Sequence, residues 1–424
     1  MRVSSPAVII MLLGSISYAA DYSFEIPQVE SKKEILELSG NLDVKYSIFK
    51  IRNNSPMYSL QYYGRQLPDI LSSYRMEYYL NGDYQTRDIG VHLKTQAEYY
   101  NDKTSYFNLY ELYGDVNLSA NSFLHMGKKM YNWGKGYAFN PVGYVNSAKN
   151  PENPELSQAG LFSVNYEYSK SFQTKTINNI AFDLIVIPSE NTVNNKISEI
   201  ENTAIAGKLY LLLLDTDVDF MQYYSKVNLK KSGMDFSRNI LTGLEIHGEL
   251  SLLRNQPTYL ISNNALETKH IEGTSYLFGL RWLNAWNITT ILEYYHNDAG
   301  LSVKEFEDYN NYLVNAIISG NTDSLSNALK TAISNFNGTN LMQDYLYLKI
   351  SWPEPFNWVY FTPSIYAVIN TNDRSSMMGM PISYKPITNL EFIFWPAFFA
   401  GSINSEFGSK QYENKLDLWM RFYF

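Results

Sequence analysis

Residues 36–48 read LELSGNLDVKYSI, and every second residue of this stretch belongs to the same class. The even positions carry Leu36, Leu38, Gly40, Leu42, Val44, Tyr46 and Ile48, and the odd positions carry Glu37, Ser39, Asn41, Asp43, Lys45 and Ser47. Successive side chains of a β-strand point to opposite faces, so the pattern predicts one apolar and one polar face. The stretch is longer than the usual strand of a globular protein. It suits a tilted strand that crosses a bilayer, which needs about 9–11 residues.

The same alternation recurs along the chain. Further copies occupy residues 74–81, 91–99, 162–169, 244–252 and 345–352. One such segment is weak evidence, but many of them separated by turn residues predict an antiparallel, all-β chain. An apolar face on every strand is what a barrel in a membrane requires.

The composition is consistent with that fold class. The 424 residues are 45% hydrophobic and include 36 Tyr and no Cys, so there is no disulfide framework. Beyond the N-terminus, the longest aliphatic run is residues 211–214, which is too short for a membrane-spanning helix. The formal net charge of −8 makes the chain a poor candidate for nucleic-acid binding.

The N-terminus has the three parts of a secretory signal peptide. Arg2 precedes an apolar run from Ala7 to Leu13, and Ser17-Tyr18-Ala19 supplies small residues for cleavage. We therefore expect a signal peptide over residues 1–19, cleaved after Ala19 or Ala20. A periplasmic N-terminal segment or small plug then covers residues 20–35, and the barrel covers residues 36–424.

Turn-like and loop-like segments alternate, as expected for short periplasmic turns and long external loops. Tight connections are expected at 86–88, 215–217, 284–287 and 353–356, and long loops at 52–71, 132–159, 254–272 and 297–342. Seventeen strands are evident, but the last strand runs opposite to the first only if the number of strands is even. Residues 232–237, taken as a short additional strand before a turn near Arg238, give an even number. The sequence therefore predicts a barrel of about 18 strands, with 16 as the alternative.

The loop at 297–342 contains apolar residues at helical spacing. One set runs from Val303 to Ile317 and a second from Leu325 to Phe336, and Asp323 is a candidate cap for the second helix. Two helices here would form a lid or a surface hat. The alternative is a loop that packs on itself.

The C-terminus reads LDLWMRFYF over residues 416–424, with apolar residues at every even position. This strand resembles the terminal strand that the assembly machinery of Gram-negative outer-membrane β-barrels recognises. An extended terminal segment can pair with a sheet edge while its side chains fill alternate pockets. The resemblance implies that the assembly signal comprises Leu418, Met420, Phe422 and Phe424.

A second segment, residues 127–141, reads GKKMYNWGKGYAFNP. It resembles the strand-to-loop segment of several porin-like families, in which a Gly-Lys strand ends in Trp-Gly and then Asn-Pro. Glycines permit a sharp bend, and the prolines that follow exclude a regular strand. The loop can fold into the lumen and narrow it, or pack against the rim. The residues expected to form a constriction are Trp133, Gly134, Lys135, Asn140 and Pro141.

Charged residues on the polar faces are candidates for the lining of a pore, because such charges are costly on a lipid-facing surface. The candidates are Arg75, Glu77, Lys94, Glu98, Glu245, His247, Glu249, Arg281, Lys349 and Arg421. Their signs are mixed, so they either set selectivity or pair with one another across strands. Aromatics near strand ends, among them Trp282 and Trp419, are interpreted as an interface girdle, with a sugar-stacking track as the alternative.

These features together predict a porin-like channel in the outer membrane of a Gram-negative bacterium, for passive diffusion of small hydrophilic solutes. The alternatives are an export barrel for a polymer or peptide, and a barrel enzyme built on Glu245, His247 and Glu249. Neither a catalytic triad nor metal-ligand spacing is evident, and we expect no cofactor. The expected partners are outer-membrane lipid and lipopolysaccharide, the barrel assembly machinery and small solutes, and the oligomeric state stays open.

Overall fold

The computed structural model describes residues 35–65, 67–156, 158–174, 176–188, 203–226 and 228–424. The predicted signal peptide lies outside the described residues, as does the predicted periplasmic segment except for Ile35. The residues from Ile35 to Phe424 belong to one compact unit.

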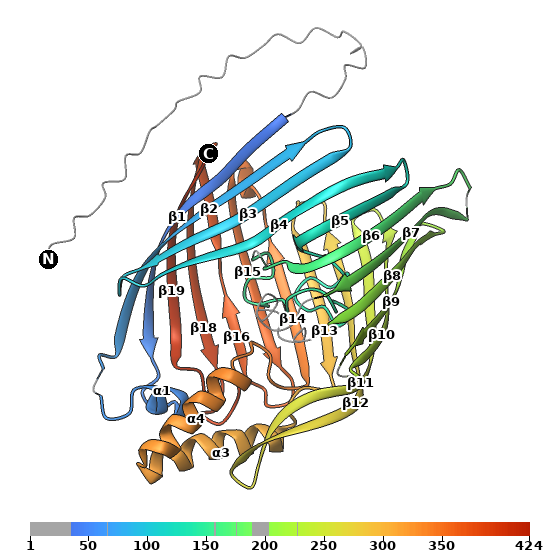
Figure 1. Cartoon of the computed structure of the whole chain (residues 1–424). Helices are drawn as coiled ribbons and strands as arrows, with labels where there is room; N and C mark the ends of the chain where they lie inside the picture. Colours follow the sequence, from blue (N-terminus) through green and yellow to red (C-terminus); the bar gives the residue numbers. More distant parts are fainter. Residues whose placement is uncertain (1–34, 66, 157, 175, 189–202, 227) are drawn as a thin grey trace, which may run out of the picture. The chain divides into compact units, whose positions relative to one another are not determined.

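Antiparallel strands make up most of this unit (Figure 1). The first ten are β1 (Ile35–Ile51), β2 (Ile70–Gln85), β3 (Ile89–Tyr100), β4 (Ser105–Ser119), β5 (Ser122–Lys129), β6 (Leu161–Ser171), β7 (Ile177–Ile187), β8 (Ala204–Leu213), β9 (Thr216–Ser225) and β10 (Lys230–Leu241). The others are β11 (Leu244–Ser262), β12 (Ala265–Leu283), β13 (Thr289–Asn297), β14 (Asp344–Ser351), β15 (Phe361–Asn370), β16 (Ser376–Gly379), β17 (Ile382–Ile387), β18 (Leu390–Ala400) and β19 (Tyr412–Tyr423).

Strands that follow one another in sequence pair with each other, except β16 and β17, and β19 pairs with β1 to close the sheet. β16 and β17 share one position, because both pair with β15 on one side and with β18 on the other. Pro381, which has no N–H for the ladder, lies between them. The sheet is therefore a closed barrel of 18 strand positions, which confirms the predicted fold class and excludes 16.

The two ends of the barrel differ in the length of their connections. At one end the strands are joined by short turns such as 86–88, 214–215, 242–243 and 284–288. At the other end lie the longer connections 52–69, 130–160, 298–343 and 401–411. Two sequence predictions need correction here. Residues 232–237 belong to the full-length strand β10, whose turn is at 242–243, and not to a short strand that turns near Arg238.

The predicted long loop at 254–272 is wrong. These residues continue β11 and β12, which meet at Asn263 and Asn264, both with positive φ (50° and 61°). Asn adopts the left-handed conformation more readily than most residues, so this pair forms a tight hairpin turn. A register shift between Leu253 and Gln256 interrupts the alternation at the base of the hairpin. Because of this β-bulge, the sequence pattern predicts a loop at a place where both strands continue.

Helices gather at the end with the long connections (Figure 1). They are α1 (Pro56–Gln61), α3 (Val303–Ser319) and α4 (Thr322–Asn335), and a short 3-10 turn, η1 (Pro355–Asn357), lies in the β14–β15 connection. The helical spacing in the longest loop therefore predicted both helices. The cap of α4 is Asn321 rather than Asp323, because the Asn321 side chain accepts hydrogen bonds from the backbone of Asp323 and Ser324. None of the helices in the described ranges has the length and hydropathy of a membrane span.

The two faces of the strands differ as the alternation requires. On β1, Leu36 and Leu38 are 65% and 63% exposed, whereas Asp43 and Lys45 are buried on the other face. Large apolar side chains are exposed on the outward face of many other strands, for example Phe107, Met126 and Phe278. Such a belt is unfavourable in water and suits a lipid environment. The barrel therefore has the architecture of an outer-membrane protein.

Candidate functional site: an inward loop and the chamber beside it

The long connection after β5 packs against the inner wall of the barrel. Residues 130–156 of this connection form the inward loop, in which Trp133, Ala138, Phe139 and Val142 are at 3% exposure or less. Gly134 has a φ of +95°, and a Cβ atom there would lie 2.8 Å from the carboxylate of Glu249. Glycine is therefore needed both for the turn and for the close approach to the wall.

Glu249 on β11 is the first of two buried carboxylates that anchor this loop. One of its oxygens accepts hydrogen bonds from the backbone N–H groups of Lys135 and Gly136, at 2.6 Å each. The other accepts from Val142 N–H at 3.2 Å. A carboxylate that accepts several N–H bonds satisfies backbone donors that burial would otherwise leave unpaired.

Glu293 on β13 is the second anchor. It accepts hydrogen bonds from the backbone N–H groups of Tyr137 and Ala138, the latter at 2.8 Å. His247 on β11 reaches the same carboxylate with its Nε2 atom at 3.0 Å, across the intervening strand β12. The reach is possible because Gly279 of β12 lies beneath the imidazole, where a Cβ atom would come within 2.1 Å of Nε2. Two strands thus hold one turn of the loop.

A lysine and an apolar cluster complete the attachment. The Nζ atom of Lys135 lies 2.9 Å from Asp219 and 4.0 Å from Asp235, two buried carboxylates that face each other in the β9–β10 register. Trp133 and Tyr144 pack with inward-facing apolar residues of β6 to β9, such as Ile185 and Met221. The inward loop therefore lies against one side of the barrel wall, from β6 to β13.

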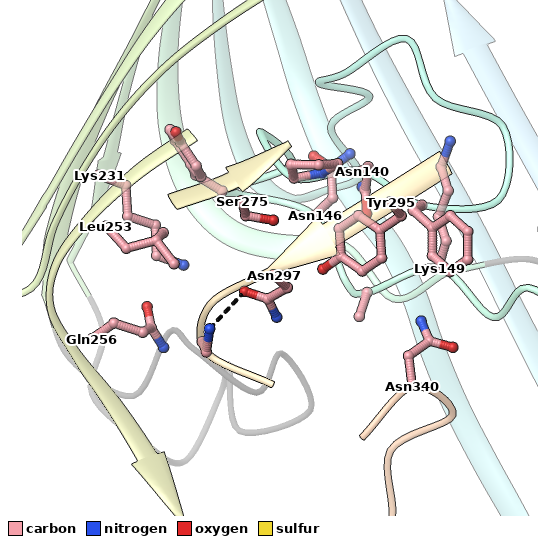
Figure 2. Close-up of a pocket in the computed structure, with 16 residues that line it drawn as sticks. Asn140, Asn146, Lys149, Lys231, Leu253, Gln256, Ser275, Tyr295, Asn297 and Asn340 are labelled. Carbon is pink, nitrogen blue, oxygen red and sulfur yellow. Dashed lines mark hydrogen bonds between the residues drawn. The ribbon is translucent and has the colours of Figure 1, made fainter. Parts of the chain in front are cut away.

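A small polar pocket separates the loop from part of this wall (Figure 2). Its volume is about 140 Å³, and carboxamides from the loop, β11, β13 and the segment before β14 converge on it: Asn140, Asn146, Gln256, Asn297 and Asn340. Figure 2 shows Asn297 accepting a hydrogen bond from the backbone of the following turn, which is the 3.1 Å bond from Ala299 N–H.

A larger chamber lies on the other side of the barrel interior. It has a volume of about 470 Å³ and is walled by β1, β2, β14, β15, β17, β18 and β19. Residues 152–156 of the inward loop form its remaining side. Two ion pairs join that side to the wall: Glu155 lies 3.3 Å from Lys349 of β14, and Glu152 pairs with Lys415 of β19. The loop thus occupies one part of the lumen and borders an open space in the other.

The predicted lining residues lie on inward-facing strand positions, in separate groups. Arg75 and Glu77 form an ion pair of 2.7 Å on β2, and Glu98 on β3 accepts a hydrogen bond from Tyr100. Lys94 lies opposite Glu111 in register, and Arg281 opposite Glu245. The remaining candidates lie at the inward loop, where Glu249 and His247 are, and at the chamber, which Lys349 and Arg421 line.

The predicted constriction residues divide between two environments. Trp133, Gly134 and Lys135 contact the wall from β7 to β11, and Asn140 and Pro141 line the small pocket. The predicted assembly residues Leu418, Met420, Phe422 and Phe424 are exposed on the outer face of the barrel, at 39–50%.

Several residues that shape the site were not singled out from the sequence. Glu293 and the pair Asp219 and Asp235 also occupy inward-facing positions, but their contact with the loop depends on segments more than 80 residues away. The prediction that Trp419 lies in the interface girdle is wrong, because this residue lines the chamber with Trp395. Its odd position in the terminal strand, on the same face as Asp417 and Arg421, is the signal that places it inside. Trp282 and Trp358, by contrast, are about half exposed, at 49% and 53%.

Within the described residues, no group of three or more His, Cys, Asp or Glu side chains has the arrangement of a metal site. His247 lies between two carboxylates, at 3.6 Å from Glu245 and 3.0 Å from Glu293. Of the three residues proposed for catalysis, His247 bridges β11 to Glu293 of β13, and Glu249 binds the backbone of the loop.

No protein-family model and no curated protein sequence matches the chain. Solved structures do match over most of its length. OccK8 (OprE) of Pseudomonas aeruginosa superposes with a TM-score of 0.56 at 8% identity, covering 92% of this chain and 98% of that one. OccK2 (OpdF) of the same species, in complex with glucuronate, gives 0.53 at 9% identity, with coverages of 92% and 97%.

A third match is Wzi of Escherichia coli, described as a carbohydrate-binding β-barrel involved in capsule assembly. It has a TM-score of 0.52 at 11% identity and covers 90% of this chain and 84% of that one. At these identities the likeness shows a shared fold, that of an outer-membrane β-barrel.

Proposed function

We propose that this protein is a porin-like channel of the Gram-negative outer membrane, which passes small hydrophilic solutes by diffusion. The observation that carries the proposal is the off-centre placement of the inward loop. It fills the side of the lumen next to β6–β13 and borders a polar chamber next to β14–β19 and β1. A barrel of this size without a filling element encloses an aqueous channel, so a partial filling leaves a narrower one.

The mechanism is selection by width and charge, with no chemical step. The inward loop, with Trp133, Lys135 and Pro141 in its body, sets the width of the passage. The inward-facing charges line it, including Arg75, Lys94, Glu245 and Arg281. Solved porins with the same fold, one of them bound to glucuronate, support a role in the passage of small solutes.

The outer surface of the barrel indicates what surrounds the protein. The apolar belt contacts outer-membrane lipid, and lipopolysaccharide surrounds the end with the long loops. The assembly machinery recognises the last strand, whose apolar residues face outward. An export barrel for a polymer is less well supported, because the inward charges are of both signs rather than a track of one sign.

Liposome swelling tests the proposal. Vesicles that contain the purified protein should swell in isotonic solutions of small sugars or amino acids, and the rate should fall steeply as solute size increases. A protein that gives the same rate as empty vesicles for every solute, while its heat-modifiable mobility shows a folded barrel, is not a diffusion channel.

A further inference from the structure

The charged side chains that line the chamber balance one another. Three are cationic, Lys45, Lys349 and Arg421, and three are anionic, Glu152, Glu155 and Glu391. Lys45 lies 2.7 Å from Glu77, and Arg421 makes two hydrogen bonds of 2.8 Å to Asp43.

The anionic residues are paired as well. Glu391 lies 3.6 Å from Arg421 and also accepts a hydrogen bond from Ser383. Glu155 is matched by Lys349, and Glu152 by Lys415. Each charge in the lining therefore has an opposite charge beside it. A charged solute would leave its hydration shell here and gain no unmatched partner in exchange, whereas a neutral polar solute loses less.

The rest of the lining consists of aromatic rings and hydroxyl groups. Tyr137, Tyr347, Tyr366, Trp395 and Trp419 form a continuous row in which successive ring centroids are 5.5–6.5 Å apart. Tyr347 and Tyr366 are buried within the row. Tyr137 and Trp419 at its two ends stay partly exposed, with Lys349 4.7 Å and Lys45 4.0 Å from their respective ring centroids. Rows of this kind are rigid and offer flat apolar faces next to hydrogen-bonding groups.

Hydroxyl side chains of neighbouring strands face the same chamber, among them Ser351, Thr362 and Ser364. Flat rings beside hydroxyls match a molecule with apolar C–H faces and a rim of hydroxyl groups. The volume of about 470 Å³ falls within the usual range for small-molecule sites.

We propose that the chamber is a binding site for an uncharged, polyhydroxylated solute of the size of a mono- or disaccharide. This inference rests on the proposed channel function, since it names the class of solute that the channel favours. Binding itself is measurable whether or not the barrel conducts.

The test compares three sugars of nearly equal size by isothermal titration calorimetry on the full-length barrel in detergent: glucose, glucuronate and glucosamine. Glucose should bind about tenfold more tightly than either charged analogue. Equal or tighter binding of glucuronate or glucosamine overturns the inference, and so does the absence of glucose binding. Glucose binding without vesicle swelling supports the site and rejects the channel, so the two failures are distinguishable.

Charge-pair variants give a second readout. The Glu155 side chain is 71% exposed, so Glu155→Gln should fold normally and leave Lys349 without its carboxylate. This variant should gain affinity for glucuronate, and Lys349→Met should gain affinity for glucosamine. Unchanged preferences in both folded variants contradict the role of charge balance.

An aromatic variant tests the stacking surface. Trp419→Ala should weaken glucose binding about tenfold, because the row loses one of the two end rings whose surface stays partly exposed. The matched control is Trp282→Ala, which removes a half-exposed indole from β12 that does not line the chamber. Equal glucose affinity in Trp419→Ala and in the wild type argues against the site.

Discussion

Gly40 and Phe424 exchange two backbone hydrogen bonds of 3.1 Å, at the seam where β1 meets β19. The Phe424 ring lies over Gly40, where a Cβ atom would come within 2.6 Å of the ring and 2.2 Å of the Tyr79 carbonyl oxygen. The ring also stacks on Tyr78 at 5.6 Å. The last residue of the chain therefore closes the barrel through a position that accepts only glycine.

Barrel assembly should be sensitive to both residues. Gly40→Ala forces a methyl group against backbone and ring, a strain of about 1–3 kcal/mol, and Phe424→Asp places a charge on the outer face. Both variants should yield less heat-modifiable barrel in outer-membrane fractions. Gly114→Ala is the control, because its Cβ would meet only one atom within 4 Å, at 3.6 Å. Wild-type levels of folded Gly40→Ala would show that the seam tolerates a side chain.

Loop attachment should depend on Glu249. Glu249→Ala removes the acceptor for three backbone N–H groups, and hydrogen bonds to a charged group contribute about 1.5–3 kcal/mol each. The loop should then be cut faster by added protease and the channel current should become larger and noisier. Glu245→Ala, on the same strand and face, leaves these bonds in place and serves as the control. A quiet, unchanged current in Glu249→Ala would mean that the other contacts suffice.

The long connection that carries α3 and α4 should be more stable in acid than at neutral pH. Glu406, in the β18–β19 connection, is buried and accepts hydrogen bonds of 2.7 Å from Leu341 N–H, Tyr345 and Asn370. Burial raises its pKa above the ordinary 4.5, although Lys410 and the hydrogen bonds oppose this shift.

Because the folded pKa is raised, the folded state binds the proton more tightly than the unfolded one. This contribution to stability is fully present below pH 4.5 and is lost as the pH rises through the folded value. Limited proteolysis of the 298–343 segment should therefore be slower at pH 4.5 than at pH 7.5. Glu406→Gln, which resembles the protonated acid, should remove most of the difference. If the Glu406→Gln variant shows the same pH dependence of proteolysis as the wild type, other groups cause that dependence.

The topology is tested by epitope tags. A tag next to Gly320, between α3 and α4, should be accessible to antibody on intact cells, and a tag at Glu354 should not, because these connections lie at opposite ends of the barrel. Equal labelling of the two tags before cell lysis would invert or break the assignment of the ends.

The closed barrel could be predicted from the sequence because its determinants are local. Alternation over residues 36–48 specifies which face of β1 is apolar without knowledge of any partner. The same rule should have placed Trp419 inside, since it shares a face with Asp417. The alternation rule failed at residues 254–272 because the bulge between Leu253 and Gln256 interrupts the alternation of apolar and polar residues. Such an interruption resembles the end of a strand.

The position of the inward loop could not be predicted, since it depends on contacts between distant segments. The glycines of the segment predict the bend at Gly134, but a loop at the rim and a loop in the lumen would both use this bend. The direction is set by Glu249 and Glu293, which lie more than 100 residues further along the chain. No spacing within residues 127–141 encodes those partners.

The central claim is that an off-centre loop narrows a conducting barrel, and single-channel conductance tests it most directly. The wild-type protein and a variant in which residues 133–156 are replaced by a short Gly-Ser linker should be compared in planar bilayers. Both should conduct, and the variant should show the larger single-channel conductance, because its lumen is wider. Equal conductance of the two folded proteins, or no conductance from either, would contradict the account.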